Sequence, residues 1–258
     1  MDNATYDPQF FARIAAIEEK HFWFSSRARV IRAIVSQTVQ SLPPGYVVME
    51  IGCGTGMVLR HLVEVCKQGR VIGLDLYPEA VAFAAAKAGC PVVAGDIAHP
   101  PPLERADVIG MFDVLEHLPD DNKALRDVRA MLGPGGVLLL TVPAHMSLWS
   151  YFDIAAKHCR RYDRRSLINV LAASGFEIEY VTEFMLATLP LLWLKRRSRS
   201  ESANDQNTVA EKTLDELQII PGLNAILKLV LAWEPYAIQR RWQLRGGSSL
   251  LAIARRNT

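Results

Sequence analysis

A glycine-rich loop is the segment of this sequence whose residue types most clearly favour ligand binding. It reads Glu50-Ile51-Gly52-Cys53-Gly54-Thr55-Gly56 and lies between an apolar run, residues 46–51, and a predicted helix that begins at Met57. Glycine lets the backbone turn tightly and lets a ligand approach bare peptide groups at the start of a helix. The pattern predicts a ligand-binding turn between a buried strand and a helix.

The spacing of these glycines argues against a dinucleotide. A GxGxxG fingerprint would place its third glycine at position 57, where this chain has Met57, and the observed spacing is GxGxG. The carboxylate of Glu50, directly before the loop, would repel a pyrophosphate but attract the amino group of a sulfonium amino acid. The loop therefore favours a cationic ligand.

Two further acidic residues follow the next two predicted strands. Asp75 ends a strand at residues 70–75, where its carboxylate could accept both hydroxyls of a ribose. Asp96 follows a strand at residues 91–94 and could accept a hydrogen bond from an adenine amino group, with Ile97 packing on the ring. Because the carboxyl ends of parallel strands meet at one edge of a sheet, these acids are expected beside the glycine loop.

The elements that position these residues alternate between strand and helix. We expect helices at residues 57–66, 78–88, 121–131 and 165–174, and strands at residues 46–51, 70–75, 91–94, 106–111, 137–142, 176–181 and 248–254. Such alternation predicts an α/β fold with a Rossmann-like, doubly wound, mostly parallel sheet. The last strand is expected to be antiparallel, with a helical insertion before it.

The two flanking segments differ from this core. The N-terminus reads as two helices, with Ser25 or Ser26 capping the second, and Pro43-Pro44-Gly45 marks a turn. Before the last strand, a polar stretch at residues 198–208 is expected to be a mobile loop, and residues 223–233 an amphipathic helix. We expect an N-terminal helical lid at 1–45, a core at 46–184 plus 246–258, and a helical insertion at 185–245.

The composition of the chain limits the kinds of ligand and partner that it is expected to bind. The chain has 258 residues, half of them apolar, and a net charge of +2, which disfavours a nucleic-acid partner. Its four cysteines lie far apart without zinc-site or disulfide spacing, and no acidic cluster has clear metal spacing, so we expect a metal-free protein in the reducing cytoplasm. The start is unlike a secretory signal, and the apolar runs fall short of the roughly 20 residues of a transmembrane helix.

Taken in order, these segments resemble the class I S-adenosylmethionine-dependent methyltransferases. The resemblance covers residues 47–181 and includes Phe112-Asp113-Val114-Leu115-Glu116-His117-Leu118-Pro119 and Leu132-Gly133-Pro134-Gly135-Gly136. It implies S-adenosyl-L-methionine as cofactor. The cofactor-binding residues expected from it and from the strand ends are Glu50, Gly52, Cys53, Gly54, Gly56, Asp75, Leu76, Asp96, Ile97, Phe112, Asp113 and Val114.

Methyl transfer needs alignment more than a reactive side chain, but a hydroxyl acceptor would benefit from a general base. Histidine, with an ordinary pKa of ~6.5, suits that role. His117 is expected at the carboxyl end of the fourth strand, and His158 in a loop after the fifth. Either could be catalytic. For His117 a structural role beside the cofactor, and for His158 the start of a solvated basic loop, are the alternatives.

A subset of the family resembles this chain further. The shared segments are His21-Phe22-Trp23-Phe24 with Arg27, a His-x-Arg-Arg-Tyr loop at residues 158–162, and Gly-Ser-Ser-Leu-Leu at residues 247–251. The resemblance implies an N-terminal helix over the cofactor and acceptors such as small phenols, quinone precursors, or glycan- or lipid-linked hydroxyls. The aromatic run could equally be a hydrophobic staple. Substrate-binding residues are expected at Trp149, Arg160, Arg161 and Tyr162.

Three functions remain open on the sequence. We favour a metal-independent O-methyltransferase for a small-molecule, glycan-linked or lipid-linked acceptor. A non-catalytic S-adenosylmethionine-binding scaffold, or a cyclopropane-forming enzyme on the same fold, is the alternative. The apolar run at residues 189–194, followed by basic residues at 195–199, could contact an anionic membrane surface, form a dimer or pack on its own domain. The oligomeric state stays open.

Overall fold

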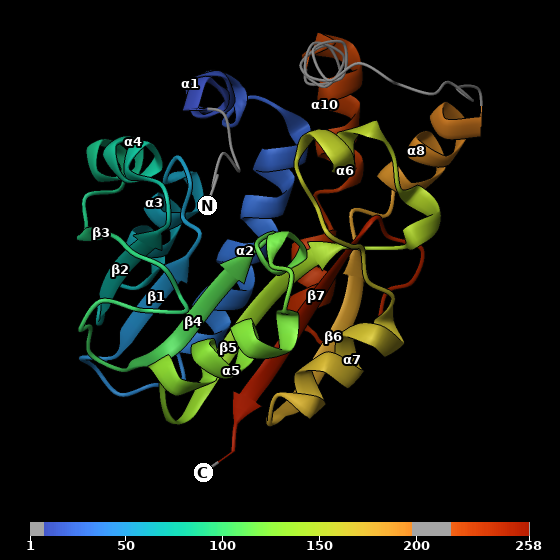
Figure 1. The fold of residues 1–258 in the computed structure, drawn as a ribbon. Helices are drawn as coiled ribbons and strands as arrows, with labels where there is room; N and C mark the ends of the chain where they lie inside the picture. Colours follow the sequence, from blue (N-terminus) through green and yellow to red (C-terminus); the bar gives the residue numbers. More distant parts are fainter. Residues whose placement is uncertain (1–7, 198–217, 258) are drawn as a thin grey trace.

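One seven-stranded sheet organises the chain, with strand order β3-β2-β1-β4-β5-β7-β6. The computed structural model describes residues 8–197 and 218–257. β7 runs antiparallel to both of its neighbours, and β1 to β5 pair in parallel (Figure 1). The strands are β1 (Val47–Ile51), β2 (Arg70–Asp75), β3 (Val92–Ala94), β4 (Ala106–Phe112), β5 (Leu132–Pro143), β6 (Phe176–Phe184) and β7 (Ser249–Arg256).

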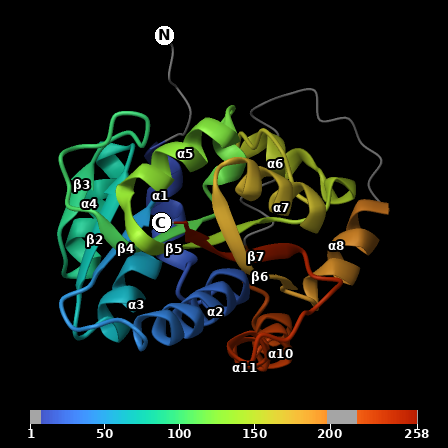
Figure 2. The same cartoon turned by 90° about the horizontal axis from the view of Figure 1, so that it is seen from below.

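Helices cover both faces of this sheet. Figure 2 shows α2, α3 and α11 on one face and α5 and α7 on the other. The helices are α1 (Pro8–Ile17), α2 (Phe22–Val39), α3 (Met57–Val65), α4 (Pro78–Ala88), α5 (Asp121–Met131), α6 (Tyr151–Ala155), α7 (Arg164–Ala173), α8 (Thr188–Arg197), α10 (Pro221–Val230) and α11 (Glu234–Gln239). Short 3-10 turns are η1 (Leu115–His117) and η2 (Met146–Leu148).

The core lies in two layers because the sheet is covered on both sides. Every residue of β1 is buried, as expected of a central strand without a solvent face. Along β1, Met49 and Ile51 pack in the layer towards α5 and α7, whereas Val48 packs in the layer towards α2 and α3. The alternating side chains of one strand thus hold both helical layers in place.

The strand order creates a crevice at the carboxyl ends of β1 and β4. β1 pairs with β2 on one side and with β4 on the other, so the chain reverses its direction of winding between them. Open α/β sheets bind ligands at such a point. In Figure 1, α1 and α6 lie beyond these strand ends, and the loops after β1 and β4 open towards them.

The α/β prediction is confirmed, including the antiparallel last strand. The expected helices at 78–88 and 121–131 and the strand at 70–75 match at both ends. The capping prediction was wrong: Ser25 and Ser26 lie inside α2, and the cap is His21, whose Nδ1 accepts a hydrogen bond from the backbone N–H of Trp23 at 3.2 Å. β5 begins at Leu132, because Ala106 pairs with Leu132 before the ladder shifts register.

Residues before β7 form helices where an insertion was expected. The helix expected at 223–233 corresponds to α10 (Pro221–Val230), and a second helix, α11 (Glu234–Gln239), follows it. The polar stretch expected to be a mobile loop, residues 198–208, lies outside the described residues. Within residues 8–197 and 218–257, none of the helices has the length and apolar character that crossing a bilayer requires.

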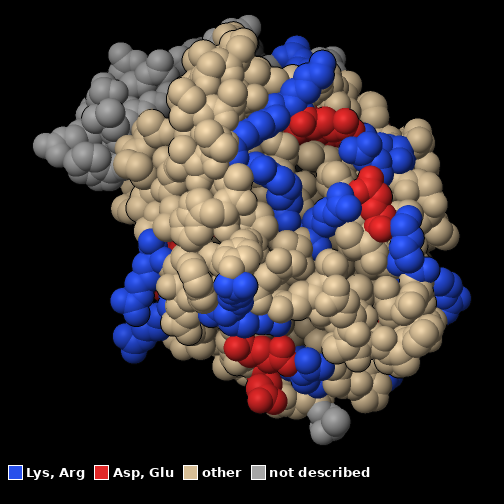
Figure 3. All heavy atoms as spheres, turned by 180° about the vertical axis from the view of Figure 1, so that it is seen from behind, with Lys and Arg blue, Asp and Glu red and all other residues tan. Residues whose placement is uncertain are grey.

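The surface charge is mixed. On the face that Figure 3 shows, basic and acidic side chains lie interspersed. This distribution agrees with the small net charge of +2. The described part of this face therefore does not present the continuous basic surface that tracks a phosphate backbone.

Candidate functional site

The glycine loop after β1 is tight at two positions and open at a third. Gly52, Gly54 and Gly56 have φ angles of 70°, 51° and 80°, which glycine adopts without strain. A Cβ on Gly52 would lie 2.4 Å from a methyl of Val114, and one on Gly56 would lie 2.7 Å from Cα of Ala84. Among the described residues, no heavy atom outside Gly54 and its two chain neighbours lies within 4 Å of the corresponding position on Gly54. The backbone at Gly54 is thus accessible to a ligand.

Two buried carboxyl groups stand beside this loop. Glu50 is 3% exposed, and its Oε2 has no hydrogen-bond partner among the described residues. Burial and the nearby Asp75 raise the pKa of Glu50 well above its usual range. Asp75 accepts hydrogen bonds from the backbone N–H of Gly54 at 2.8 Å and of Tyr77 at 3.0 Å. Burial nevertheless raises the pKa of Asp75, against these hydrogen bonds.

This pair of acids fits a positively charged ligand. A buried carboxylate without a partner is costly, and a second one nearby increases that cost. A cation would remove both penalties, whereas a pyrophosphate would add to them. The residues present therefore fit the ammonium and sulfonium groups of S-adenosylmethionine, with Glu50 and Asp75 nearest the loop.

The third acid, Asp96, lies in a more exposed turn. Its Oδ1 accepts a hydrogen bond from the backbone N–H of Ala98 at 2.9 Å. Ile97 is partly buried against the core, and Leu76, next to Asp75, is 49% exposed. Cys53 is buried, and burial raises the pKa of its thiol. Roles for these four side chains at the cofactor remain predictions.

The loop after β4 is fastened to the N-terminal helix α2. Asp113 adopts a φ of 56° and forms an ion pair with Arg27, which is 5% exposed. The guanidinium also donates to Ser249 Oγ at 2.6 Å and Thr141 Oγ1 at 3.2 Å. Phe112 is buried before this loop. Arg27 thus connects the carboxyl ends of β4 and β5 with the start of β7, a contact that sequence reasoning did not predict.

The end of α1 contacts the glycine loop itself. Glu18 is 3% exposed, its Oε2 accepts a hydrogen bond from Thr55 Oγ1, and its Oε1 lies 2.6 Å from Lys87 Nζ. Thr55 belongs to the loop, and Lys87 belongs to α4. The segment between α1 and α2 is therefore held directly against the residues expected to bind the cofactor.

Both candidate catalytic histidines lie at this end of the sheet. The rings of His117 and His158 meet edge to face with centroids 4.7 Å apart. His158 Nδ1 lies 3.0 Å from Asp153 Oδ1. Burial alone would raise the pKa of Asp153, but hydrogen bonds with His158 and Arg161 hold it below its usual value. Burial and the neighbouring His158 lower the pKa of His117 to about 4, so this imidazole is neutral near pH 7.

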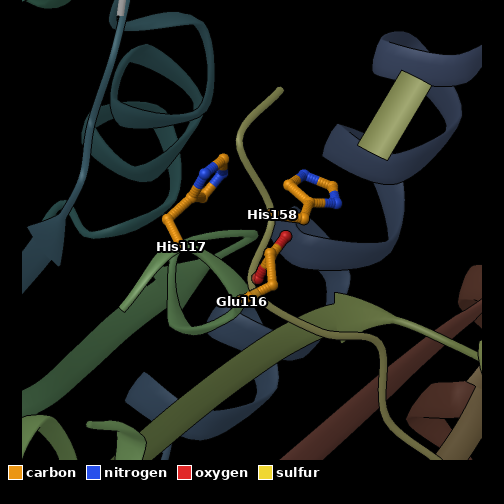
Figure 4. A group of neighbouring side chains, drawn as sticks. All are labelled: Glu116, His117 and His158. Atoms are coloured by element: carbon orange, nitrogen blue, oxygen red, sulfur yellow. The ribbon is translucent and has the colours of Figure 1, made fainter. Parts of the chain in front are cut away.

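Glu116 completes this group, although sequence reasoning assigned it no role. It is 1% exposed, comes from η1 beside His117, and its Oε2 has no partner among the described residues. Figure 4 shows its carboxylate reaching towards the two imidazoles. The adjacent Glu-His pair was visible in the sequence, but the burial of Glu116 was not.

The expected substrate-binding residues all follow β5, and three of them have partners within the protein. Arg160 contacts Asp121 at 2.9 Å, and Tyr162 donates a hydrogen bond to the same carboxylate at 2.9 Å. Arg161 Nε lies 2.6 Å from Asp153. Trp149 is partly buried after η2. These contacts hold the α6 region against α5, and substrate binding by the four residues stays a prediction.

Comparisons with known proteins agree with this geometry. A model of the methyltransferase domain family matches residues 23–181. A protein of Mycolicibacterium smegmatis named "probable S-adenosylmethionine-dependent methyltransferase" is 31% identical over 222 residues, or 83% of this chain and 82% of that protein. A ubiquinone biosynthesis O-methyltransferase of Proteus mirabilis is 28% identical over 124 residues, or 44% of this chain and 49% of that protein.

A solved structure shares the fold. The N-methyltransferase NodS from Bradyrhizobium japonicum, in complex with S-adenosyl-L-homocysteine, has a TM-score of 0.57 at 17% identity, over 97% of this chain and 98% of that chain. The matched family model spans β1 to β6 and therefore includes the glycine loop, both buried acids and the loop after β4. The chain belongs to the class I S-adenosylmethionine-dependent methyltransferases, and S-adenosylmethionine is its cofactor.

Proposed function

We propose that this methyltransferase acts on a hydroxyl group of a small-molecule, glycan-linked or lipid-linked acceptor. The observation that carries the proposal is the contact between His158 and Asp153, next to His117 at the carboxyl end of β4. A hydroxyl must lose its proton when it is methylated, whereas an ionised carboxylate has none to lose. A histidine oriented by a buried carboxylate is suited to receive such a proton.

The chemistry divides between cofactor and protein. S-adenosylmethionine supplies the methyl group when bound and becomes a neutral thioether. The chain's own residues orient the reactants and manage the acceptor proton. His158 has its Nδ1 committed to Asp153, which leaves Nε2 to face the acceptor. His117 packs against that ring and keeps both roles considered from the sequence, a general base or a structural residue beside the cofactor. The O-methyltransferase name of the Proteus mirabilis relative supports the same acceptor class.

The N-terminal segment, residues 1–45, is proposed to act as a lid, with the 185–245 insertion holding it. The contacts of Glu18 with Thr55 and of Arg27 with Asp113 support the lid. Asn224 of α10 accepts a hydrogen bond from the backbone N–H of Phe22 at 2.7 Å and donates one to the carbonyl of Lys20 at 3.0 Å. Asn224, which lies in the insertion, therefore holds the start of α2 in place by two hydrogen bonds.

A lipid-linked acceptor, or contact with an anionic membrane surface, is supported by α10. This helix exposes a row of apolar side chains, namely Leu223, Ile226, Leu229 and Val230, with Trp233 directly after it. Apolar surface of this kind partitions into a lipid interface. Co-sedimentation with anionic vesicles but not with neutral ones would support this part of the proposal, and no binding to either would refute it.

Product analysis with an isotopically labelled methyl donor tests the acceptor class. A panel of phenols, glycan-linked and lipid-linked hydroxyls, carboxylic acids and amines is incubated with the full chain. We expect label on a hydroxyl oxygen, and label confined to nitrogen or carboxylate would contradict the proposal. His158→Ala is expected to lower turnover more than His117→Ala, with cofactor affinity retained. Equal, near-wild-type turnover in both variants would remove the histidines from the chemistry.

A further inference from the structure

Glu116, His117 and His158 form a compact set of potential metal ligands. One ligand atom from each of the three residues lies within 4.8 Å of the other two (Figure 4). Glu116 and His117 come from η1, and His158 comes from the loop after α6. The backbone N–H of Cys159 donates to the carbonyl of Glu116 at 2.7 Å, which fixes the two segments to each other. The set is therefore held by main-chain contacts as well as by packing.

The carboxyl group in this set is buried with one of its oxygens unsatisfied within the described part of the chain. Glu116 is 1% exposed and its Oε2 has no hydrogen-bond partner among the described residues. A buried carboxyl group of this kind is stabilised when it is paired with a cation or coordinates a metal.

His158 is oriented as metal ligands usually are, with one ring nitrogen held by a carboxylate. His158 contacts Asp153, which is fully buried and is itself held by Arg161 and by the backbone N–H of Ser150 at 2.8 Å. The ring of His117 lies edge to face with that of His158, with the centroids 4.7 Å apart. A carboxylate or carbonyl that binds one ring nitrogen fixes the tautomer and directs the other nitrogen to the ion.

We propose that Glu116, His117 and His158 bind a divalent transition-metal ion of the Zn²⁺ type, with a coordination position open to the acceptor. Two imidazoles and one carboxylate suit Zn²⁺, Fe²⁺ and their neighbours better than Mg²⁺, which prefers oxygen ligands. Three protein ligands and one open position are typical of catalytic rather than structural zinc sites. The proposal departs from the metal-free site expected from sequence spacing, which could not show that positions 117 and 158 meet.

The role of the ion rests on the proposed function, but its binding does not. An acceptor hydroxyl at the open position would lose its proton more readily, because a bound cation lowers the pKa of a coordinated oxygen. The proton would then leave to bulk water, and His117 and His158 would hold the ion instead of accepting that proton. Metal binding can be measured without acceptor or methyl transfer, so failure of one proposal is distinguishable from failure of the other.

The experiment uses the full chain after treatment with a chelator. Zn²⁺, Co²⁺ and Mg²⁺ are titrated separately by calorimetry, and bound metal is counted by elemental analysis. We expect one Zn²⁺ or Co²⁺ per chain, and at least tenfold weaker binding of Mg²⁺. Glu116→Gln and His158→Ala should each weaken Zn²⁺ binding at least tenfold, while a thermal shift with S-adenosylmethionine shows that both variants remain folded.

Two controls separate this site from adventitious binding. His61→Ala removes a histidine of α3 that pairs with Glu64, far from η1 in sequence, and should leave Zn²⁺ affinity unchanged. Cys159→Ser tests the exposed thiol beside His158. The Co²⁺ complex should lack thiolate charge-transfer absorption. Absence of stoichiometric binding, or loss of binding in Cys159→Ser but not in Glu116→Gln, would overturn the proposal.

Discussion

Arg27 of α2 forms an ion pair with Asp113, directly after β4, and so joins the N-terminal helices to the edge of the sheet where the cofactor loop lies. The guanidinium is almost fully buried and stacks on the rings of Trp23 and Phe184 at 5.3 and 5.0 Å. Its planar fork contacts a carboxylate and two hydroxyls at once, which a lysine ammonium on a flexible stem cannot reproduce.

Arg27→Met should therefore destabilise the protein. The change leaves Asp113 without its cation, close to the buried Glu116. Breaking a buried pair costs about 3–5 kcal/mol, and because Asp113 is partly exposed we expect a loss of roughly 2–3 kcal/mol in the free energy of unfolding. Urea denaturation checks this value. Arg27→Lys should recover less than half of the loss, and a methionine variant as stable as the wild type would show that the ion pair contributes nothing.

Glu50→Gln should make the protein more stable near neutral pH and its cofactor binding weaker. Because burial raises the pKa of Glu50, the folded protein keeps this proton to a higher pH than the unfolded chain does. The free energy of unfolding of the wild type therefore falls as the pH rises from the ordinary glutamate pKa towards the raised one. Glutamine has no proton to lose, so the variant should lack that fall.

The same substitution removes the charge that a cationic cofactor would meet. We expect at least tenfold weaker binding of S-adenosylmethionine, or about 1.4 kcal/mol. Denaturation between pH 5 and pH 8 and calorimetry with the cofactor give the two readouts. Glu177→Gln, on the exposed side of β6, is the matched control and should change neither. An unchanged affinity in Glu50→Gln would exclude Glu50 from the cofactor site.

Glu18→Gln should loosen the contact between α1 and the glycine loop. The variant keeps the size of the side chain but loses the charge that pairs with Lys87 and the strong acceptor for Thr55. We expect the cofactor to dissociate several-fold faster and the N-terminus to be cleaved more readily by protease, with little change in the sheet. Glu19→Gln is the neighbouring control, since Glu19 is exposed and pairs with Lys87 and Arg60 at 3.3 Å. Equal dissociation rates in both variants would argue against the lid.

Gly52→Ala and Gly54→Ala should separate folding from binding. At Gly52 the new methyl group would overlap Val114 at a positive φ, so we expect a loss of roughly 2–4 kcal/mol in stability. At Gly54 the methyl group has space, and only the backbone strain of about 1 kcal/mol remains. Thermal melts and calorimetry should show Gly54→Ala folded but with weakened cofactor binding. Wild-type affinity in Gly54→Ala would mean that the ligand approaches elsewhere.

The elements with strong local signals could be predicted from the sequence to the residue. Pro78 and Gly89 bound α4, with Gly89 in the left-handed conformation that ends a helix, and Asp120 caps α5 by accepting a hydrogen bond from the backbone N–H of Lys123. The start of α2 was predicted wrongly because two local signals, good capping residues and apolar residues before them, favoured different helix starts. Ser25 and Ser26 are good caps, but the apolar residues before them pack in the helix and move its start to His21.

The candidate site was harder to predict wherever it depends on burial or on distant residues. Nothing in the sequence distinguishes Glu116, whose Oε2 is unsatisfied among the described residues, from a solvated glutamate. Nothing there shows that Asp153 holds His158 and Arg161 together. The contacts of Arg160 and Tyr162 with Asp121 could not be predicted either, because Asp121 is about 40 residues away in the chain. Contacts between side chains that are distant in the sequence decide which polar residues have a partner within the protein. Local sequence patterns do not reveal these contacts.

The placement of β7 between β5 and β6 also constrains how a newly made chain can fold. β6 leaves the ribosome before β7, yet its place at the sheet edge is reached only through β7. During synthesis β6 therefore stays unpaired until β7 has been made. Its apolar side is exposed to chaperones or to other nascent chains during that time. Translation pauses within residues 185–248 should thus lower the yield of native protein more than pauses within residues 76–105, where each completed strand already has a neighbour.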